Sequence, residues 1–253
     1  MSTEGSRHDG DKAAMVEAMF DRLARRYDRM NDIMTFGNHR LWKRAATHAL
    51  LAPTGAAPAR VLDVATGTGD LALTVLRTRP RARAVGLDFS ALMLAEARAR
   101  GRAEAPPDGR LALVRGDALA LPFPDGAFSA ASSGFALRNV VDLGRMFREL
   151  HRVLAPGGRL ALLDLVPVPA PPPWTWLAQF HLQRVVPKLG AVLAGDAAAY
   201  QYLPSSVGTI PPLPAIERML REAGFRDVRH RLFGLGTVAL ITGTREAPEA
   251  PPR

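Results

Sequence analysis

The side chains of this chain that are best placed to do chemistry are acids at the ends of apolar runs. In the stretch RVLDVATGTGD, residues 60–70, Asp63 lies near the end of a run that predicts a buried strand, and Gly67 and Gly69 follow in a tight turn. Glycine has no side chain to keep backbone away from a ligand. The Asp63 carboxylate would repel the pyrophosphate of a dinucleotide but hold an ammonium or sulfonium group. The pattern favours S-adenosylmethionine, with a turn that only packs a strand on a helix as the alternative.

Two further acids end apolar runs later in the chain. Asp88 ends the run AVGLD, and an acid at the end of the second strand of a doubly wound fold faces ribose hydroxyls. Phe89 follows, and Ser90 is suited to cap the next helix. Asp117 and Ala118 end the run of residues 111–118, where an Asp can accept a hydrogen bond from an adenine amino group. The alternative for Asp88 is a solvated residue in a turn, and the Gly-Asp turn at Asp117 would mean little on its own.

Longer motifs resemble one known family. They are MFDRLARRYDRMNDIMTFGNHRLWKR at residues 19–44, GFALRNVVD at 134–142, RVLAPGGRL at 152–160, GDAAAYQYLPSSV at 195–207 and LREAGFRDV at 220–228. Over about residues 15–245 the chain resembles the ubiquinone/menaquinone biosynthesis C-methyltransferases, of the demethylmenaquinone methyltransferase type. The N-terminal run and the Leu-Arg-Asn triplet carry the specificity, because other class I methyltransferases share only the first three strand ends.

The resemblance implies S-adenosylmethionine as cofactor, and Thr68, Asp88, Asp117 and Ala118 match the cofactor contacts of the family. With the turn and strand-end residues, the predicted cofactor set is Asp63, Gly67, Thr68, Gly69, Asp88, Phe89, Asp117, Ala118 and Gly134. The implied reaction is C-methylation of a reduced polyprenyl quinone precursor, demethylmenaquinol to menaquinol. A benzoquinol substrate and the length of the prenyl tail stay open.

The fourth predicted strand, around residues 129–135, delivers Arg138 and Asn139 to the edge that faces the transferred methyl group in many class I methyltransferases. We predict that both stabilise the oxyanion of the substrate, while Asp70 or His39 takes up the proton. The alternative role for Arg138 is a structural ion pair with Asp142 or Glu149. Substrate contacts are predicted at Tyr27, Asn31, Trp42, Tyr200 and Tyr202, of which the first three equally suit helix packing.

Three positions depart from the family pattern. Gly134 stands where the family usually has a serine, and Ala136 replaces a glycine. Ile241 stands where a histidine usually follows Val-Ala-Leu. A hydroxyl contact to the cofactor and a role for that histidine therefore do not carry over to this chain.

The composition narrows the classes of function. The chain has no cysteine, which excludes disulfides, thiolate metal sites and a cysteine nucleophile, and no metal site is predicted. Its net charge of +9 would draw it to nucleic acid or anionic lipid, unless the arginines are only a solvated surface. We expect a cytoplasmic protein, peripheral at the inner face of the membrane, whose partners are a membrane-embedded prenylated quinol and anionic lipid, and not nucleic acid. A homodimer stays open.

Alternating strands and helices, followed by two closing strands, predict an α/β fold. By the resemblance this is the Rossmann-like, seven-stranded sheet of class I methyltransferases, with an N-terminal helical lid. The predicted divisions are tails at 1–11 and 246–253 around one domain at 12–245, with a lid at 12–50, a cofactor core at 60–165, a substrate- or membrane-facing insertion at 167–210, and a closing helix and strands at 211–245.

Three other functions remain open at this point. A methyltransferase of secondary metabolism acting on a soluble phenol would use the same scaffold. A nucleic-acid methyltransferase would explain the charge, but the chain has no NPPY-type motif. A protein that binds S-adenosylmethionine without catalysis is the third.

Overall fold

The computed structural model of this chain describes residues 31–32, 35, 37–51, 59–104, 108–167 and 210–247. Several predictions from the sequence lie outside these residues. They are residues 12–30 of the lid, nearly all of the insertion at 167–210, nearly all of both tails, and the predicted substrate residues Tyr27, Tyr200 and Tyr202.

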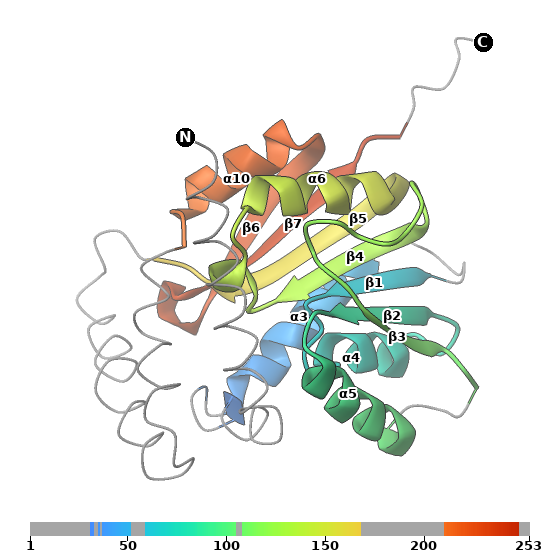
Figure 1. The fold of residues 1–253 in the computed structure, drawn as a ribbon. Helices are drawn as coiled ribbons and strands as arrows, with labels where there is room; N and C mark the ends of the chain where they lie inside the picture. Colours follow the sequence, from blue (N-terminus) through green and yellow to red (C-terminus); the bar gives the residue numbers. More distant parts are fainter. Residues whose placement is uncertain are drawn as a thin grey trace, which may run out of the picture.

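A seven-stranded sheet forms the centre of the molecule (Figure 1). Its strand order is β3-β2-β1-β4-β5-β7-β6, in which β1 to β5 are parallel and β7 runs antiparallel to both β5 and β6. The strands are β1 (Arg60–Val64), β2 (Arg83–Asp88), β3 (Leu111–Arg115), β4 (Phe128–Gly134), β5 (Leu154–Leu165), β6 (Phe225–Phe233) and β7 (Val238–Arg245). This order is that of the predicted class I methyltransferase sheet. The edge where β1 to β5 end is called the carboxyl edge below.

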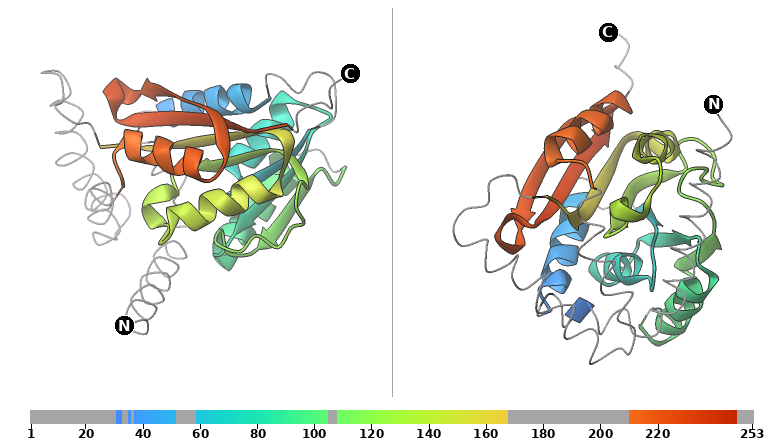
Figure 2. Two further views of the ribbon diagram at one scale, coloured as in Figure 1. Left: turned by 90° about the horizontal axis from the view of Figure 1, so that it is seen from above. Right: turned by 60° about the vertical axis from the view of Figure 1, so that its left-hand side comes forward.

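Helices cover the two faces of the sheet (Figure 2). One face carries α3 (Asn38–Leu51), α4 (Asp70–Thr78) and α5 (Ala91–Glu104), and the other carries α6 (Leu143–Val153) and α10 (Leu213–Glu222). Two short 3-10 helices, η2 (Leu137–Asn139) and η4 (Gly234–Gly236), lie at the carboxyl edge. Because β1 is covered on both faces, its apolar residues are fully buried, as expected for a central parallel strand.

Helix α3 differs from the lid predicted for residues 12–50. Its side chains Ala46, Leu50 and Leu51 are buried in a cluster with residues of β1 and β7, and the helix contacts β4, β5 and β7. It is therefore a core helix of the sheet, because its apolar positions fall on one side and close the face that α4 leaves open. Only its first turns reach the carboxyl edge.

Three element boundaries have local causes. Helix α6 begins at Leu143, because the Asp142 carboxylate caps it by accepting from the backbone N–H of Arg145 at 2.8 Å. Strand β5 begins at Leu154, and its register against β4 shifts between Leu154 and Arg159. Strand β6 begins at Phe225, where the fully buried phenyl ring anchors it.

Candidate functional site

A cavity of about 310 Å³ opens at the carboxyl edge, between the ends of β1, β2 and β4. Most of its lining is apolar, and two carboxylates and one amide are its polar side chains. The lining residues are Ala65, Gly67, Asp88, Phe89, Met93, Asp117, Ala118, Leu119, Gly134, Phe135, Ala136, Asn139, Val140 and Val141. Of the predicted cofactor set, Gly67, Asp88, Phe89, Asp117, Ala118 and Gly134 line it. A mostly apolar cavity with a few convergent polar groups is typical of a small-molecule site.

Asp88 organises the floor of this cavity. Its side chain is nearly buried, at 5% exposed, and its carboxylate accepts from the backbone N–H of Gly67 at 2.7 Å and of Ser90 at 3.0 Å. Gly67 has a φ of +56°, and a Cβ placed there would meet nothing within 4 Å. The hydrogen bond from Gly67 thus holds the glycine turn next to Asp88, and the space beside the Cα of Gly67 is open for a ligand. A carboxylate that lines the cavity at the end of β2 suits the hydroxyl groups of a ribose.

Asp117 lies at the far end of the cavity, on an exposed turn after β3. Its Oδ1 accepts from the backbone N–H of Leu119 at 2.9 Å, which leaves Oδ2 for an amino group such as that of adenine. Phe89, Met93 and Leu119 add apolar surface to the lining that contains the two acids. Two acids and apolar side chains in one cavity suit the ribose and the adenine of an adenosine, so the residues present fit S-adenosylmethionine.

Asp63, for which the sequence predicts a contact with the cofactor, is not among the residues that line the cavity. Its side chain is 1% exposed and accepts hydroxyl hydrogen bonds from Thr66 at 2.6 Å and Ser132 at 2.8 Å. Burial raises the pKa of its carboxyl to about 6, although the two hydroxyl donors oppose the rise. Asp63 thus ties the glycine turn to β4 and holds the shape of the site from beneath.

This raised pKa predicts a pH-dependent contribution to stability. The folded protein retains the Asp63 proton up to about pH 6, whereas an ordinary Asp loses it near 3.8. The contribution of this carboxyl to the free energy of unfolding is therefore complete below about pH 4 and falls, by roughly 3 kcal/mol, as the pH rises to about 6. Urea unfolding of the wild type and Asp63→Asn across this range should show the difference between them change by that amount. Asp227→Asn, which removes an exposed carboxylate, is the control, and a pH-independent difference for Asp63→Asn would contradict the assignment.

Thr68 and Gly69 also lie outside the cavity lining, and each has a structural role. Gly69 is the left-handed cap residue of α4, with a φ of +82°, and a Cβ there would lie 3.3 Å from the Cβ of Ala97 on α5. The buried Thr68 hydroxyl accepts from the guanidinium of Arg100 at 3.1 Å. The turn is thus packed and bonded against α5, which fixes the backbone that faces the ligand.

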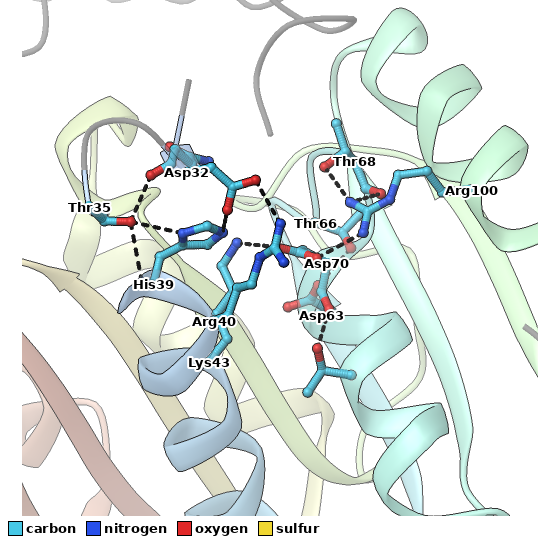
Figure 3. Close-up of polar contacts among 12 residues, drawn as sticks. Asp32, Thr35, His39, Arg40, Lys43, Asp63, Thr66, Thr68, Asp70 and Arg100 are labelled. Atoms are coloured by element: carbon cyan, nitrogen blue, oxygen red, sulfur yellow. Dashed lines mark hydrogen bonds and ion pairs between the residues drawn. The ribbon is translucent and has the colours of Figure 1, made fainter. Parts of the chain in front are cut away.

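Asp70 is held between two cations (Figure 3). The Lys43 ammonium on α3 lies 2.5 Å from Oδ2, and the Arg100 guanidinium on α5 lies 2.9 Å from Oδ1. Although burial opposes it, these charges hold the pKa of the Asp70 carboxyl well below its usual range. An acid this weakly basic is a poor proton acceptor, so the structure does not favour the general-base role predicted for it. Asp70 instead joins α3, α4 and α5 at the carboxyl edge.

His39 lies on the first turn of α3 and is buried beside the same network (Figure 3). The Thr35 hydroxyl spends its one proton on the carbonyl of Asn31, at 2.7 Å, so it accepts from His39 Nδ1 at 2.9 Å. The neutral imidazole is therefore protonated on Nδ1, and its Nε2, 3.8 Å from an Asp32 oxygen, holds the lone pair. Burial and then the Lys43 charge lower the pKa of His39, while Asp70 and Asp32 oppose this. His39 is the better placed of the two predicted bases, although it does not line the cavity.

Arg138 has a partner that differs from both acids suggested by the sequence. Its guanidinium lies 3.6 Å from Asp164 of β5, and both side chains are buried, at 5% and 1% exposed. Asp164 accepts from the backbone N–H groups of Leu137 at 2.7 Å and Leu165 at 2.8 Å, and burial raises the pKa of its carboxyl. Among the described residues, Nε and Nη1 of Arg138 have no hydrogen-bond partner. The neighbouring Asn139 lines the cavity directly.

The other predicted substrate residues in the described part of the chain lie away from the cavity lining. Trp42 packs against the α3 cluster, near Gly234 of η4, and Asn31 gives its carbonyl to Thr35. The sequence analysis missed the roles of Lys43 and Arg100. Nothing in the run WKR or in the arginine-rich α5 indicates that both side chains bind Asp70. Also missed was the apolar wall formed by Phe135, Val140 and Val141.

The three departures from the family pattern have local explanations. A Cβ at Gly134 would lie 2.9 Å from a methyl group of Leu71, so this leucine fills the place of a side chain. Ala136 has a φ of −111°, which needs no glycine. Ile241 is buried in the core on β7, opposite Leu162, where an apolar side chain packs well.

Comparison with known proteins identifies one family that this chain resembles over most of its length. The model of the ubiE/COQ5 methyltransferase family matches residues 8–245. A demethylmenaquinone methyltransferase of Roseiflexus castenholzii is 44% identical over 236 residues, covering 92% of this chain and 94% of the relative. One of Thermus thermophilus is 43% identical over 90% of this chain and 100% of the relative. The ubiquinone/menaquinone biosynthesis C-methyltransferase UbiE of Paracoccus denitrificans is 42% identical over 92% and 91%.

Solved structures agree with the fold at lower identity. A SAM-dependent methyltransferase of Aquifex aeolicus has a TM-score of 0.56 at 16% identity, covering 79% of this chain and 89% of its own. The [4+2]-cyclase SpnF has a TM-score of 0.59 at 21% identity, covering 81% and 82%. Since one of these is a cyclase, the likeness supports the fold and leaves the reaction to the site and to the family.

Proposed function

This chain belongs to the ubiE/COQ5 methyltransferase family, and we propose that it methylates a ring carbon of a reduced prenylated quinone precursor, demethylmenaquinol to menaquinol. The observation that carries the proposal is the cavity at the carboxyl edge, in which two acids suited to adenosine stand across from an apolar wall next to Asn139. When bound, S-adenosylmethionine supplies an electrophilic sulfonium methyl group. Residues of this chain would bind the cofactor and the substrate, orient them, and take up the proton that the substrate loses.

Asp88 would bind the ribose of the cofactor and Asp117 its adenine, and the open space at Gly67 would let the cofactor approach the backbone. Holding the cofactor in a fixed orientation would be the main contribution of these residues to a displacement reaction. The apolar residues Phe135, Val140 and Val141 line the remaining wall, which suits a flat aromatic ring and excludes water.

A quinol ring carbon becomes nucleophilic when the adjacent hydroxyl ionises. We assign the Asn139 amide to contact this oxygen, because it is the neutral polar side chain in the cavity lining. The charge of Arg138, the neighbouring residue of η2, favours the anionic form of the substrate, although Asp164 partly offsets this charge. The oxidised quinone has an electrophilic ring and should not accept the methyl group.

The proton that leaves the ring is assigned to His39 Nε2. The Thr35 hydroxyl fixes the tautomer that leaves this nitrogen basic, and the Asp32 carboxylate stabilises the imidazolium that forms. Because burial lowers the pKa of His39, the base stays neutral at the working pH and loses its activity only under acidic conditions.

The acid limb of the pH-rate profile tests the role of His39 as base. Variants of Asp32 and Arg40 should shift this limb in opposite directions. Asp32 raises the pKa of His39 and Arg40 lowers it, and the two side chains form an ion pair at 2.7 Å. Asp32→Asn should therefore move the acid limb to lower pH, and Arg40→Gln should move it to higher pH, each by less than about one unit because both groups are partly solvated. Initial rates of methyl transfer at saturating cofactor measure the limb. Shifts of the same sign, or none, would remove His39 from the role of base.

Methyl transfer under anaerobic conditions tests the function itself. Labelled S-adenosylmethionine is offered with a short-chain demethylmenaquinol, its oxidised quinone and a simple catechol in parallel. We expect transfer to the quinol alone. Transfer to catechol without transfer to the quinol would instead indicate a methyltransferase of soluble phenols, and cofactor binding without any transfer would indicate a non-catalytic protein.

The prenyl tail of such a substrate keeps it in a bilayer, so we also propose that this protein works at the membrane surface. In the described part of the chain, no helix has the length and apolar character needed to cross a bilayer. Contact with the membrane would then be peripheral, and the net charge of +9 favours anionic lipid.

A further inference from the structure

A second hollow, called here the basic groove, lies on the α3 face of the sheet between α3 and the edge strand β6. Its volume is about 620 Å³, and β7 forms its floor with Leu240 and Thr242. Figure 2 shows α3 and the β6–β7 pair side by side in both views, with α6 and α10 on the opposite face. The basic groove is therefore separate from the cavity that holds the proposed cofactor site.

Strand register brings the cations of β6 into this groove. Arg229 pairs with Thr242 and Arg231 pairs with Leu240, so these alternate residues share the face that α3 covers. His230, between them, directs its ring to Glu217 of α10 on the other face, at 2.7 Å. Arg44 and His48, one turn apart on α3, face the two arginines from the other wall.

The charges of the basic groove lack a protein partner among the described residues. No acidic residue lines the groove there, and no ion pair between described residues involves Arg44, Arg229 or Arg231. Arg231 stacks its guanidinium on the ring of Phe233, at 4.9 Å, which holds it in place without neutralising it. Like charges gathered at one site repel each other, so an anion that binds there relieves this repulsion.

Two exposed leucines flank the end of the groove nearest the carboxyl edge. Leu41 on α3 is 60% exposed and Leu235 in η4 is 56% exposed, and the intervening contact is that of Trp42 with Gly234. Leu235 has a φ of +57°, a left-handed conformation that is unfavourable for leucine. Packing inside the fold does not explain a large apolar side chain that is both strained and exposed, whereas insertion into a lipid surface would.

From this arrangement we propose that the basic groove binds the phosphate headgroup of an anionic phospholipid, while Leu41 and Leu235 enter the acyl region beside it. This inference rests on the proposed function in one respect: a membrane-held quinol gives the contact its purpose. The groove ends at the carboxyl edge, so a bilayer seated on it lies next to the edge where the substrate must enter.

Two features favour lipid over nucleic acid. The cations face each other across one hollow, which suits a single headgroup, whereas nucleic acid calls for a row of cations at the spacing of successive phosphates. The neighbouring leucines supply apolar surface, which a duplex cannot use but a bilayer can.

Flotation with vesicles tests the groove. Wild-type protein is mixed with vesicles of phosphatidylcholine alone, or with phosphatidylglycerol added, at low and moderate salt. We expect binding only to the anionic vesicles, weakened by salt. Arg229→Glu/Arg231→Glu should lower the affinity by about tenfold or more. The matched control, Arg148→Glu/Arg218→Glu, makes the same change of charge on α6 and α10 of the opposite face and should retain most of the binding.

A second variant separates lipid insertion from misfolding. Asn tolerates the left-handed conformation that strains leucine, so Leu235→Asn should fold at least as well as the wild type and yet bind the vesicles more weakly. Equal flotation of the groove variant and the wild type, or equal losses in the groove and control variants, would overturn the proposal. A groove variant that loses binding to duplex RNA or DNA but retains the vesicles would assign the groove to nucleic acid instead.

Two solution measurements keep this test distinct from that of the function. Binding of S-adenosylmethionine and methyl transfer to a short-chain quinol without vesicles should be unchanged in all of these variants. Normal flotation with no quinol methylated by any protein would refute the proposed function and leave the groove in place. Normal methylation with flotation insensitive to the variants would do the reverse.

Discussion

Replacing Asp88 by alanine is expected to weaken the binding of S-adenosylmethionine by roughly 100-fold or more. The variant removes the acceptor for two ribose hydroxyls, and hydrogen bonds to a charged group contribute about 1.5–3 kcal/mol each. It also frees the backbone N–H of Gly67, which Asp88 accepts at 2.7 Å and which sets the glycine turn against the cavity. Isothermal titration with the cofactor or its demethylated product measures the loss directly.

Two companion variants show whether the effect belongs to the carboxylate. Asp88→Asn keeps one acceptor oxygen and should fall between the wild type and Asp88→Ala. Asp117→Ala, at the exposed end of the cavity, should cost less because water replaces its hydrogen bonds easily. Circular dichroism and urea unfolding confirm that each variant is folded. An affinity within a few-fold of the wild type for a folded Asp88→Ala would move the cofactor away from this cavity.

Replacing Arg138 by methionine is expected to abolish turnover and to destabilise the fold by about 3–5 kcal/mol. The substitution leaves Asp164 as a buried carboxyl without its ion-pair partner, which is costly. Because burial already raises the pKa of Asp164, the variant escapes part of the cost by keeping a proton there at low pH. Its deficit in the free energy of unfolding should therefore grow as the pH rises.

The double variant Arg138→Met/Asp164→Leu separates the two consequences. It removes both charges at once, so most of the stability should return, while methyl transfer should stay lost because the positive charge next to Asn139 in η2 is absent. Arg138→Met should leave cofactor affinity nearly unchanged, since Arg138 does not line the cavity. Recovery of methyl transfer in the stable double variant would make Arg138 a structural residue only.

The strands could be predicted from the sequence because a central parallel strand is a continuous apolar run. In this chain, glycine and aspartate residues mark where these runs end. Asp88 and Asp117 were found for the same reason: the carboxyl ends of parallel strands meet at one edge, and both acids line the cavity there. Ser90 accepts from the backbone N–H of Met93, as a helix cap should. These are local rules, and the local sequence suffices for them.

The partners of charged side chains could not be predicted, because they depend on contacts far apart in the chain. Asp70 meets Lys43 from 27 residues before it and Arg100 from 30 residues after it. Without these contacts Asp70 and His39 were equal candidates for the base. Arg138 pairs with Asp164. Asp164 lies in the otherwise apolar strand β5, and nothing in the sequence indicates that this acid is the partner of Arg138. Nothing in the local sequence indicates that the hydroxyl groups of Thr66 and Ser132 bind the carboxylate of Asp63.

Helix α3 has one consequence for dynamics. Its buried side joins the hydrophobic core, its first turns carry His39 and Lys43, and its outer side forms one wall of the basic groove. A local opening of this helix would therefore disconnect the proton acceptor, the Asp70 bridge and the lipid contact in a single event. Amide hydrogen exchange along α3 should slow as one cooperative unit when either cofactor or anionic vesicles are added, because each ligand restrains the same segment.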